Sequence, residues 1–124
     1  MRILIAVLST LVALEFFFIM YLETFATKSS RTAQTFNMSK DDLANKKINT
    51  LLKNQGVYNG LIGVGIFYLL IFTQNYNDGL LAIMIYIILV SLYGAFSSGD
   101  KAIFFKQGSL VVIVSVLLLI QMIM

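Results

Sequence analysis

Residues 113–120 read Ile-Val-Ser-Val-Leu-Leu-Leu-Ile and lie inside a longer apolar run over residues 102–123. A strand of a membrane barrel alternates polar and apolar side chains, and this stretch does not alternate. Backbone groups in hydrocarbon must be hydrogen-bonded within their own segment, which favours a helix. The run also has the ~20 residues that a helix needs to cross ~30 Å of hydrocarbon. It therefore predicts a membrane-spanning helix.

Three further runs of similar length predict helices over about residues 3–27, 55–73 and 80–97. Together the four runs predict an all-α fold, a four-transmembrane-helix bundle that forms a single membrane domain over residues 1–124. We expect the first run to be retained rather than cleaved as a signal peptide, because Glu15 interrupts its apolar stretch and no small-residue cleavage site is evident.

The composition supports a membrane protein and excludes several kinds of chemistry. Hydrophobic residues make up 59% of the 124 residues and charged residues 12%, whereas soluble domains carry roughly 25% charged residues. The chain contains no cysteine and no histidine. Disulfides, thiolate nucleophiles, Cys/His zinc sites and imidazole bases are therefore excluded. We expect no metal and no cofactor, since glutamates alone make a poor metal signal.

Lysine and arginine are distributed unevenly between the two predicted faces of the membrane. The connections at residues 28–53 and 98–101, together with Lys106, hold eight of the nine basic residues, and Arg2 is the ninth. The positive-inside rule then predicts that the basic connections are cytoplasmic and that both termini lie outside. The basic loop is expected to orient the protein in the membrane and to contact anionic lipid. No nucleic acid is expected as a partner, because no aromatic-rich basic groove is visible.

The basic loop over residues 28–53 has internal order. Ser39 and Asp42 resemble a capping box with Asp in place of Glu. Apolar residues then recur at roughly helical spacing from Leu43 to Leu52, with lysines between them. This pattern predicts an amphipathic helix at the cytoplasmic interface that leads into the second span.

Two glutamates lie inside the first predicted span. Glu15 is near its middle, and Glu23 is eight residues further along, near the cytoplasmic interface. A charged acid at the centre of a span costs ~2.5–3.5 kcal/mol on insertion scales, and such residues usually face the bundle interior. At about 100° per residue the two side chains lie about 80° apart, on one broad face. We expect Glu15 to face inward and to take up a proton or find donors there.

Polar and small residues concentrate in the predicted cytoplasmic half of the other spans. Gly56, Gly60 and Gly63 form a strip that predicts close helix packing. The candidate binding or proton site consists of Glu15, Glu23, Asn54, Gln55, Tyr58, Asn59, Tyr93 and Gln107. Two interpretations remain open for these residues. They converge on a cavity that opens to the cytoplasm with Glu15 at its floor, or they are interfacial anchors and interhelix hydrogen bonds.

Several short motifs resemble the domain of unknown function 1304 family, small bacterial membrane proteins with four helices. These motifs are Ala-Leu-Glu at 13–15, Met-Tyr-Leu-Glu-Thr-Phe at 20–25, Asn-Gln-Gly-Val-Tyr-Asn-Gly at 54–60, Tyr-Gly-Ala at 93–95 and Lys-Gln-Gly at 106–108. The resemblance implies the four-helix fold and a bacterial cytoplasmic membrane, but no known activity. It points to seven of the polar residues, namely Glu15, Glu23, Asn54, Gln55, Tyr58, Asn59 and Gln107. Phe16 and Ser109 stand where members of the family often have histidine and proline, so a Glu–His chemistry is not implied here.

Three classes of function are compatible with this pattern. The first is small-molecule binding or proton-linked transport around an intramembrane glutamate, similar in plan to small multidrug exporters. The second is an intramembrane enzyme or a protein that binds a lipid or isoprenoid, and the third is a structural or assembly subunit. The sequence favours the first class, and it favours a protein that is not an enzyme over an enzyme. Expected partners are the lipid bilayer, a small molecule or lipid ligand, and a second copy in a homodimer.

Overall fold

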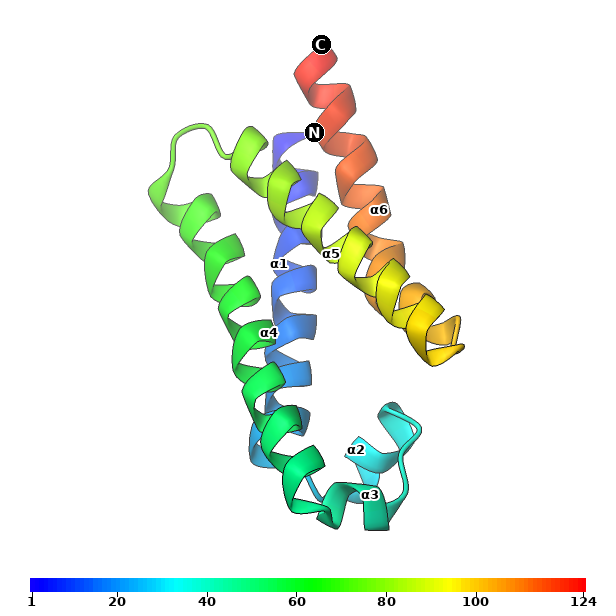
Figure 1. The fold of residues 1–124 in the computed structure, drawn as a ribbon. Helices are drawn as coiled ribbons and strands as arrows, with labels where there is room; N and C mark the ends of the chain where they lie inside the picture. The colour runs from blue at the N-terminus through cyan, green and yellow to red at the C-terminus, as the bar shows by residue number, and fades with distance from the viewer. The chain divides into compact units, whose positions relative to one another are not determined.

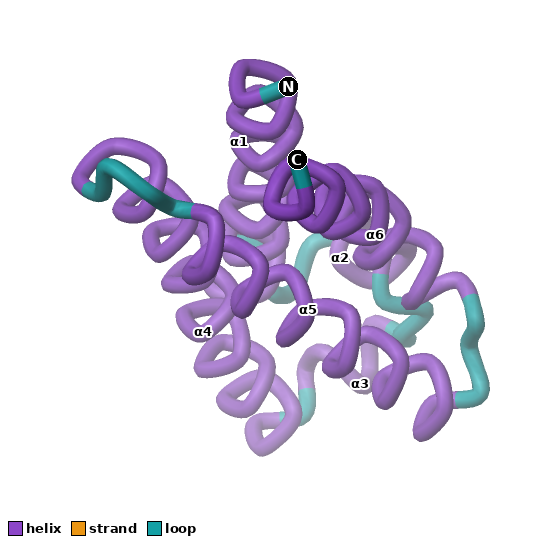
Figure 2. Tube along the Cα trace, turned by 90° about the horizontal axis from the view of Figure 1, so that it is seen from above, coloured by secondary structure: helices purple, strands orange, loops and turns teal.

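The computed structural model describes residues 1–124, and every regular element in it is helical (Figure 2). The elements in chain order are α1 (Arg2–Met20), the π-helical segment η1 (Tyr21–Phe25), α2 (Ser30–Thr35), α3 (Lys40–Ala44), α4 (Lys46–Phe72), α5 (Asn77–Ser98) and α6 (Ala102–Ile123), as Figure 1 shows. Four segments are long and apolar enough to cross a membrane: Arg2–Phe25, Lys46–Phe72, Asn77–Ser98 and Ala102–Ile123. The prediction of an all-α protein with four such helices is confirmed.

The boundaries differ from the prediction mainly at the second span. α4 begins at Lys46 rather than near residue 55, because the amphipathic segment continues into the span without a break. The rest of the basic loop holds two short helices. α3 begins with the predicted capping box, in which Ser39 Oγ accepts from the backbone N–H of Asp42 and Asp42 accepts from that of Ser39. Leu43 and Leu52 are buried, whereas Leu51 is exposed.

The chain divides into two compact units, and α1 and α4 contribute residues to both. Unit 1 contains Met1–Val12 and Gly65–Met124. Within it α5 and α6 run antiparallel and pack along their lengths (Figures 1 and 2). Gly99 allows the tight turn between them, because its φ of 74° lies in the left-handed region that favours glycine. Their buried residues include Leu80, Met84, Ile87, Val111 and Val114.

One end of unit 1 is held together by polar contacts of Arg2 and Tyr76. The Arg2 guanidinium donates to the carbonyl of Gln74 at 2.9 Å and lies 4.8 Å from the centre of the Tyr76 ring. Tyr76 Oη donates to the Arg2 carbonyl at 3.2 Å. These contacts tie the start of α1 to the turn between α4 and α5.

Unit 2 contains residues Ala13–Val64, which form the second half of α1, η1, α2, α3 and the first part of α4. Here the predicted glycine strip of α4 meets α1. A Cβ built on Gly63 would lie 3.0 Å from the Ala13 carbonyl oxygen, and one on Gly60 would collide with the Met20 side chain. The absence of side chains at these positions lets the two helices approach closely.

Candidate functional site

The candidate site lies in unit 2, where the first span changes from α-helix to π-helix. The backbone N–H of Ala26 donates to the carbonyl of Tyr21 at 2.9 Å, five residues back, and this bond defines the wider turn η1. Such π turns are rare and often occur at functional sites. Leu22 and Glu23 are the two buried residues of this turn.

Threonine hydroxyls satisfy the carbonyls that the π turn leaves free. Thr27 donates to the Glu23 carbonyl at 2.6 Å. Thr32, which is fully buried in α2, is placed to donate to the carbonyls of Ala26 at 2.7 Å and Leu22 at 3.1 Å. Its own position is set by Ser29, whose Oγ accepts from the backbone N–H of Thr32 at 3.1 Å. The short helix α2 therefore completes the end of the first span.

The side chain of Glu23 is directed at α4. Its Oε1 accepts a hydrogen bond from Asn59 Nδ2 at 2.6 Å, and the residue is 0% exposed. The second oxygen, Oε2, is buried and has no partner in the protein. An ionised carboxylate offers about four acceptor positions, and a buried charge is stable only when it is paired and fully hydrogen-bonded. No cation of the chain pairs with Glu23, so its carboxyl is under-satisfied as a carboxylate.

The glycine at position 56 allows this close approach of η1 to α4. A Cβ built on Gly56 would lie 3.0 Å from Glu23 Cβ and would collide with Thr24 Oγ1. That hydroxyl donates to the Lys53 carbonyl at 3.0 Å and forms a second direct link between the two elements. The acid–amide pair therefore lies on the glycine-lined face of α4.

Glu15 lies on a different face of the first span. Its side chain is half-buried and makes no hydrogen bond or ion pair. The α1 residues that meet the glycine strip include Ala13 and Phe17. Glu15 is two residues from each, about 200° around the helix, and so points away from α4. Within unit 2 it has no contact with the Glu23–Asn59 pair.

The remaining predicted residues of unit 2 make no hydrogen bond with the pair. Asn54, Gln55 and Tyr58 are exposed on α4, with Tyr58 69% exposed. Tyr93 is 70% exposed and Gln107 is half-buried, and both belong to unit 1. Of the predicted residues, the structure brings together Glu23, Asn59 and Gly56. No group of three or more acidic side chains that could hold a metal ion is present.

The sequence interpretation missed the three threonines at 24, 27 and 32. Thr27 is four residues after Glu23, a spacing at which a threonine hydroxyl commonly bonds the backbone of its own helix. Ser29 and Thr32 form a local N-cap pattern that the sequence displays. Nothing in the sequence indicates that Thr32 reaches back to Leu22.

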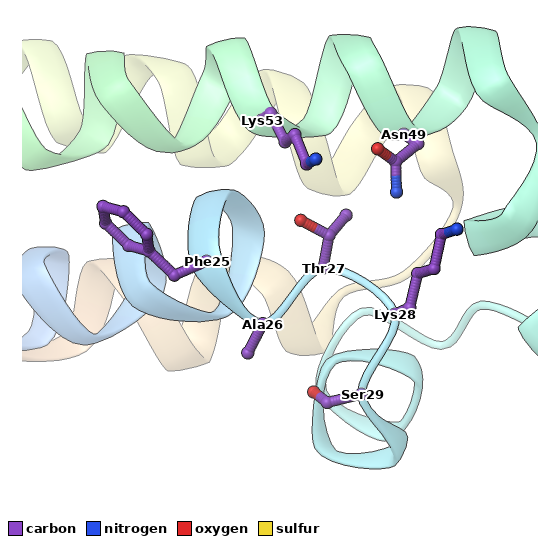
Figure 3. Close-up of a pocket in the computed structure, with 7 residues that line it drawn as sticks. All are labelled: Phe25, Ala26, Thr27, Lys28, Ser29, Asn49 and Lys53. Atoms are coloured by element: carbon purple, nitrogen blue, oxygen red, sulfur yellow. The ribbon is translucent and has the colours of Figure 1, made fainter.

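An open pocket of about 420 Å³ lies next to the π turn, between the turn after η1 and the start of α4 (Figure 3). Figure 3 shows Lys53 and Asn49 reaching from α4 toward the turn, and Lys28 reaching from the turn toward α4. Thr27, Ser29, Ala26 and Phe25 complete its lining, and no acidic residue is among them. The sequence interpretation did not anticipate this pocket, because its lining residues come from two segments that lie at least twenty residues apart.

The fold and the site define a small multi-span membrane protein with a buried acid–amide pair beside a glycine-lined helix contact. The chain belongs to the family described as "Protein of unknown function (DUF1304)", whose model matches residues 10–119. It is also 51% identical to "Uncharacterized protein YpaA" of Lactococcus lactis subsp. lactis (strain IL1403) over 113 residues, which cover 91% of this chain and 94% of that protein. No solved structure matches the chain. The resemblance inferred from the motifs is therefore confirmed.

Proposed function

We propose that the protein binds a small molecule, or transports it across the membrane in exchange for a proton. We further propose that Glu23 carries the proton. The observation that carries this proposal is the fully buried carboxyl of Glu23, which has one oxygen on Asn59 and the other without a partner. This assigns to Glu23 the role that the sequence suggested for Glu15.

A proton on Oε2 removes the charge and leaves Oε1 free to accept from Asn59. When the proton leaves, the buried carboxylate needs a replacement donor or cation, because an unpaired charge in a low-dielectric site is costly. A cationic or hydrogen-bond-donating molecule supplies that replacement. Proton release and ligand binding are then coupled through one oxygen atom, as a proton-linked exchanger requires.

The charge distribution supports an orientation for this exchanger. We infer that the basic segment over residues 28–53 faces the cytoplasm and that both termini lie outside, since eight of nine basic residues flank one face. In this orientation the Glu23–Asn59 pair lies near the cytoplasmic end of its span. The unpartnered oxygen is then close to the compartment from which a ligand or proton enters.

Infrared difference spectroscopy on the protein in lipid vesicles tests the proton carrier. We expect the carbonyl band of a protonated carboxylic acid in the parent protein and in Glu15→Gln, and a clear loss of its intensity in Glu23→Gln. Glu15→Gln is the matched control, because it removes the other intramembrane acid of the same helix. A band of undiminished intensity in Glu23→Gln would overturn the assignment.

The exchange itself is measured in vesicles loaded with a pH-sensitive dye and adjusted to acid inside. External tetraphenylphosphonium, a membrane-compatible cation, serves as the probe. We expect its uptake to make the interior more alkaline in the parent and in Glu15→Gln, and the rate in Glu23→Gln to fall to that of protein-free vesicles. Equal rates in both variants would count against a role for Glu23 in exchange.

A further inference from the structure

We propose that the pocket beside the π turn binds a phosphate group, carried either by an anionic lipid headgroup or by a soluble phosphate compound. Its volume of about 420 Å³ falls in the ~300–1,000 Å³ range of small-molecule sites. This inference concerns a different site from the Glu23–Asn59 pair and does not depend on the proposed proton exchange.

The lining of the pocket has the charge that a phosphate requires. Lys28 comes from the turn after η1 and Lys53 from α4, so two ammonium groups reach one hollow from separate segments (Figure 3). Neither lysine ammonium group has an ion-pair or hydrogen-bond partner in the chain, and no acidic residue lines the pocket. Like charges that share a hollow repel one another, and a bound anion removes this repulsion.

Neutral polar groups complement the two lysines. Asn49 lines the pocket from α4, and Thr27 and Ser29 line it from the turn, where the Thr27 hydroxyl already donates to the Glu23 carbonyl. The Asn49 amide is held in place because Nδ2 donates to the Leu43 carbonyl at 3.1 Å. Serine, threonine and asparagine side chains together with lysine are common partners of phosphate oxygens. The site thus has a donor in Lys28 from the turn and donors in Lys53 and Asn49 from the helix.

The position of the pocket suits a lipid phosphate in particular. It lies where the first membrane-spanning segment, Arg2–Phe25, ends and where the segment Lys46–Phe72 begins. Phe25 lines one side of it and is 73% exposed. An apolar ring beside two lysines matches the boundary between acyl chains and headgroups. A soluble phosphate compound would use the same lysines but not the ring.

Tryptophan fluorescence provides a direct test, because the chain contains no tryptophan. Phe25→Trp places a single fluorophore at the pocket, and brominated lipids quench it on contact. The protein is reconstituted in bilayers that contain either brominated phosphatidylglycerol or brominated phosphatidylcholine as the minor component. We expect stronger quenching by phosphatidylglycerol, and a preference that weakens about fivefold for each pocket lysine removed.

Two double variants separate the pocket from the general charge of the loop. In the Phe25→Trp background, Lys28→Gln with Lys53→Gln should abolish the preference, whereas Lys46→Gln with Lys47→Gln should retain most of it. Both pairs remove the same charge, and circular dichroism checks that both variants keep their helical content. Equal quenching by the two lipids, or an equal loss of preference in both double variants, overturns a lipid site.

Inorganic phosphate distinguishes the two sources of the ligand. It is added to the Phe25→Trp protein at constant ionic strength, with chloride as the reference anion. If the lipid preference is unchanged by phosphate, the site is assigned to a lipid headgroup. If phosphate alters the fluorescence, and Lys28→Gln with Lys53→Gln removes this response, the site takes soluble phosphate. If neither phosphatidylglycerol nor phosphate produces a lysine-dependent signal, the proposal is wrong.

Discussion

At the residue scale, the Glu23–Asn59 contact is asymmetric. The amide has its acceptor, whereas the carboxyl has one oxygen without any partner in the protein. Removing one member of such a contact costs more than removing both, because the remaining polar group stays buried and unsatisfied. Interhelix hydrogen bonds in membranes are nevertheless modest, averaging ~0.6 kcal/mol and reaching ~1.7 kcal/mol in measured cycles.

A double-mutant cycle measures this contact. We expect Asn59→Ala to lower the free energy of unfolding by about 1–2 kcal/mol, because it leaves both carboxyl oxygens of Glu23 without a protein donor. In a Glu23→Met background the same change should cost less, with a coupling energy of about 0.6–1.7 kcal/mol. Unfolding in mixed micelles, followed by circular dichroism, provides the measurement.

Asn54→Ala is the control for this cycle, since Asn54 lies on the same helix, is exposed and makes no side-chain hydrogen bond. It should leave the free energy of unfolding unchanged within about 0.5 kcal/mol. An Asn59→Ala cost that is the same with glutamate and with methionine at position 23 would show that the two side chains are not coupled.

At the element scale, the π turn η1 and the glycine-lined face of α4 act together. η1 directs Glu23 toward α4, and Gly56 leaves room for Glu23 and Thr24 to approach. The sequence predicted both helices and the glycine strip, since hydropathy and G-x-x-x-G spacing are local properties. It did not predict the π turn, because Thr32, which donates to the carbonyls at this turn, and Asn59, which donates to the Glu23 carboxyl, come from other elements.

Gly56→Ala tests this close approach. The added Cβ would collide with Thr24 Oγ1 and lie 3.0 Å from Glu23 Cβ, so the two elements must separate. We expect a loss of about 1–3 kcal/mol in the free energy of unfolding. Gly65→Ala on the same helix is the matched control, because its nearest neighbour, Ile83 Cδ1, would be at 3.4 Å, an ordinary contact.

The control should be neutral or slightly stabilising, since alanine favours helix over glycine by about 1 kcal/mol. Thermal unfolding in detergent, compared with the parent protein, distinguishes the two substitutions. If Gly56→Ala is as stable as Gly65→Ala, the separation of η1 and α4 is not limited by side-chain contact at position 56.

At the scale of the whole molecule, we expect charge and hydropathy to set the arrangement of the chain in the bilayer. Four segments are long and apolar enough to span it, and eight of the nine basic residues lie in or beside the connections at residues 28–53 and 98–101. Basic residues in short loops are retained on the cytoplasmic side during insertion. Two of these basic residues, Lys28 and Lys53, also line the pocket beside the π turn. The basic segment therefore contributes both to the proposed orientation and to the proposed phosphate site.

Single-cysteine labelling tests the orientation, and the cysteine-free chain makes this direct. We expect Gln74→Cys to react with a membrane-impermeant maleimide in intact bacterial cells, because it lies on the side with few basic residues. Lys40→Cys in the basic segment should react only after the membrane is permeabilised. Both side chains are exposed in the structure, so access to the thiol depends on the membrane alone. The reverse labelling pattern would place the basic segment outside.

The sequence by itself determined the number of spans, the helical class, the family and the residue types of the candidate site. These follow from properties that add along the chain, such as hydropathy, charge and short motifs. Only the tertiary structure decided which acid is paired, because the hydrogen bond joins residues 36 positions apart. Glu15 and Glu23 are both intramembrane glutamates by sequence. They differ in surroundings because Glu23 lies against an asparagine and a glycine of α4, while Glu15 points to the opposite side of its helix.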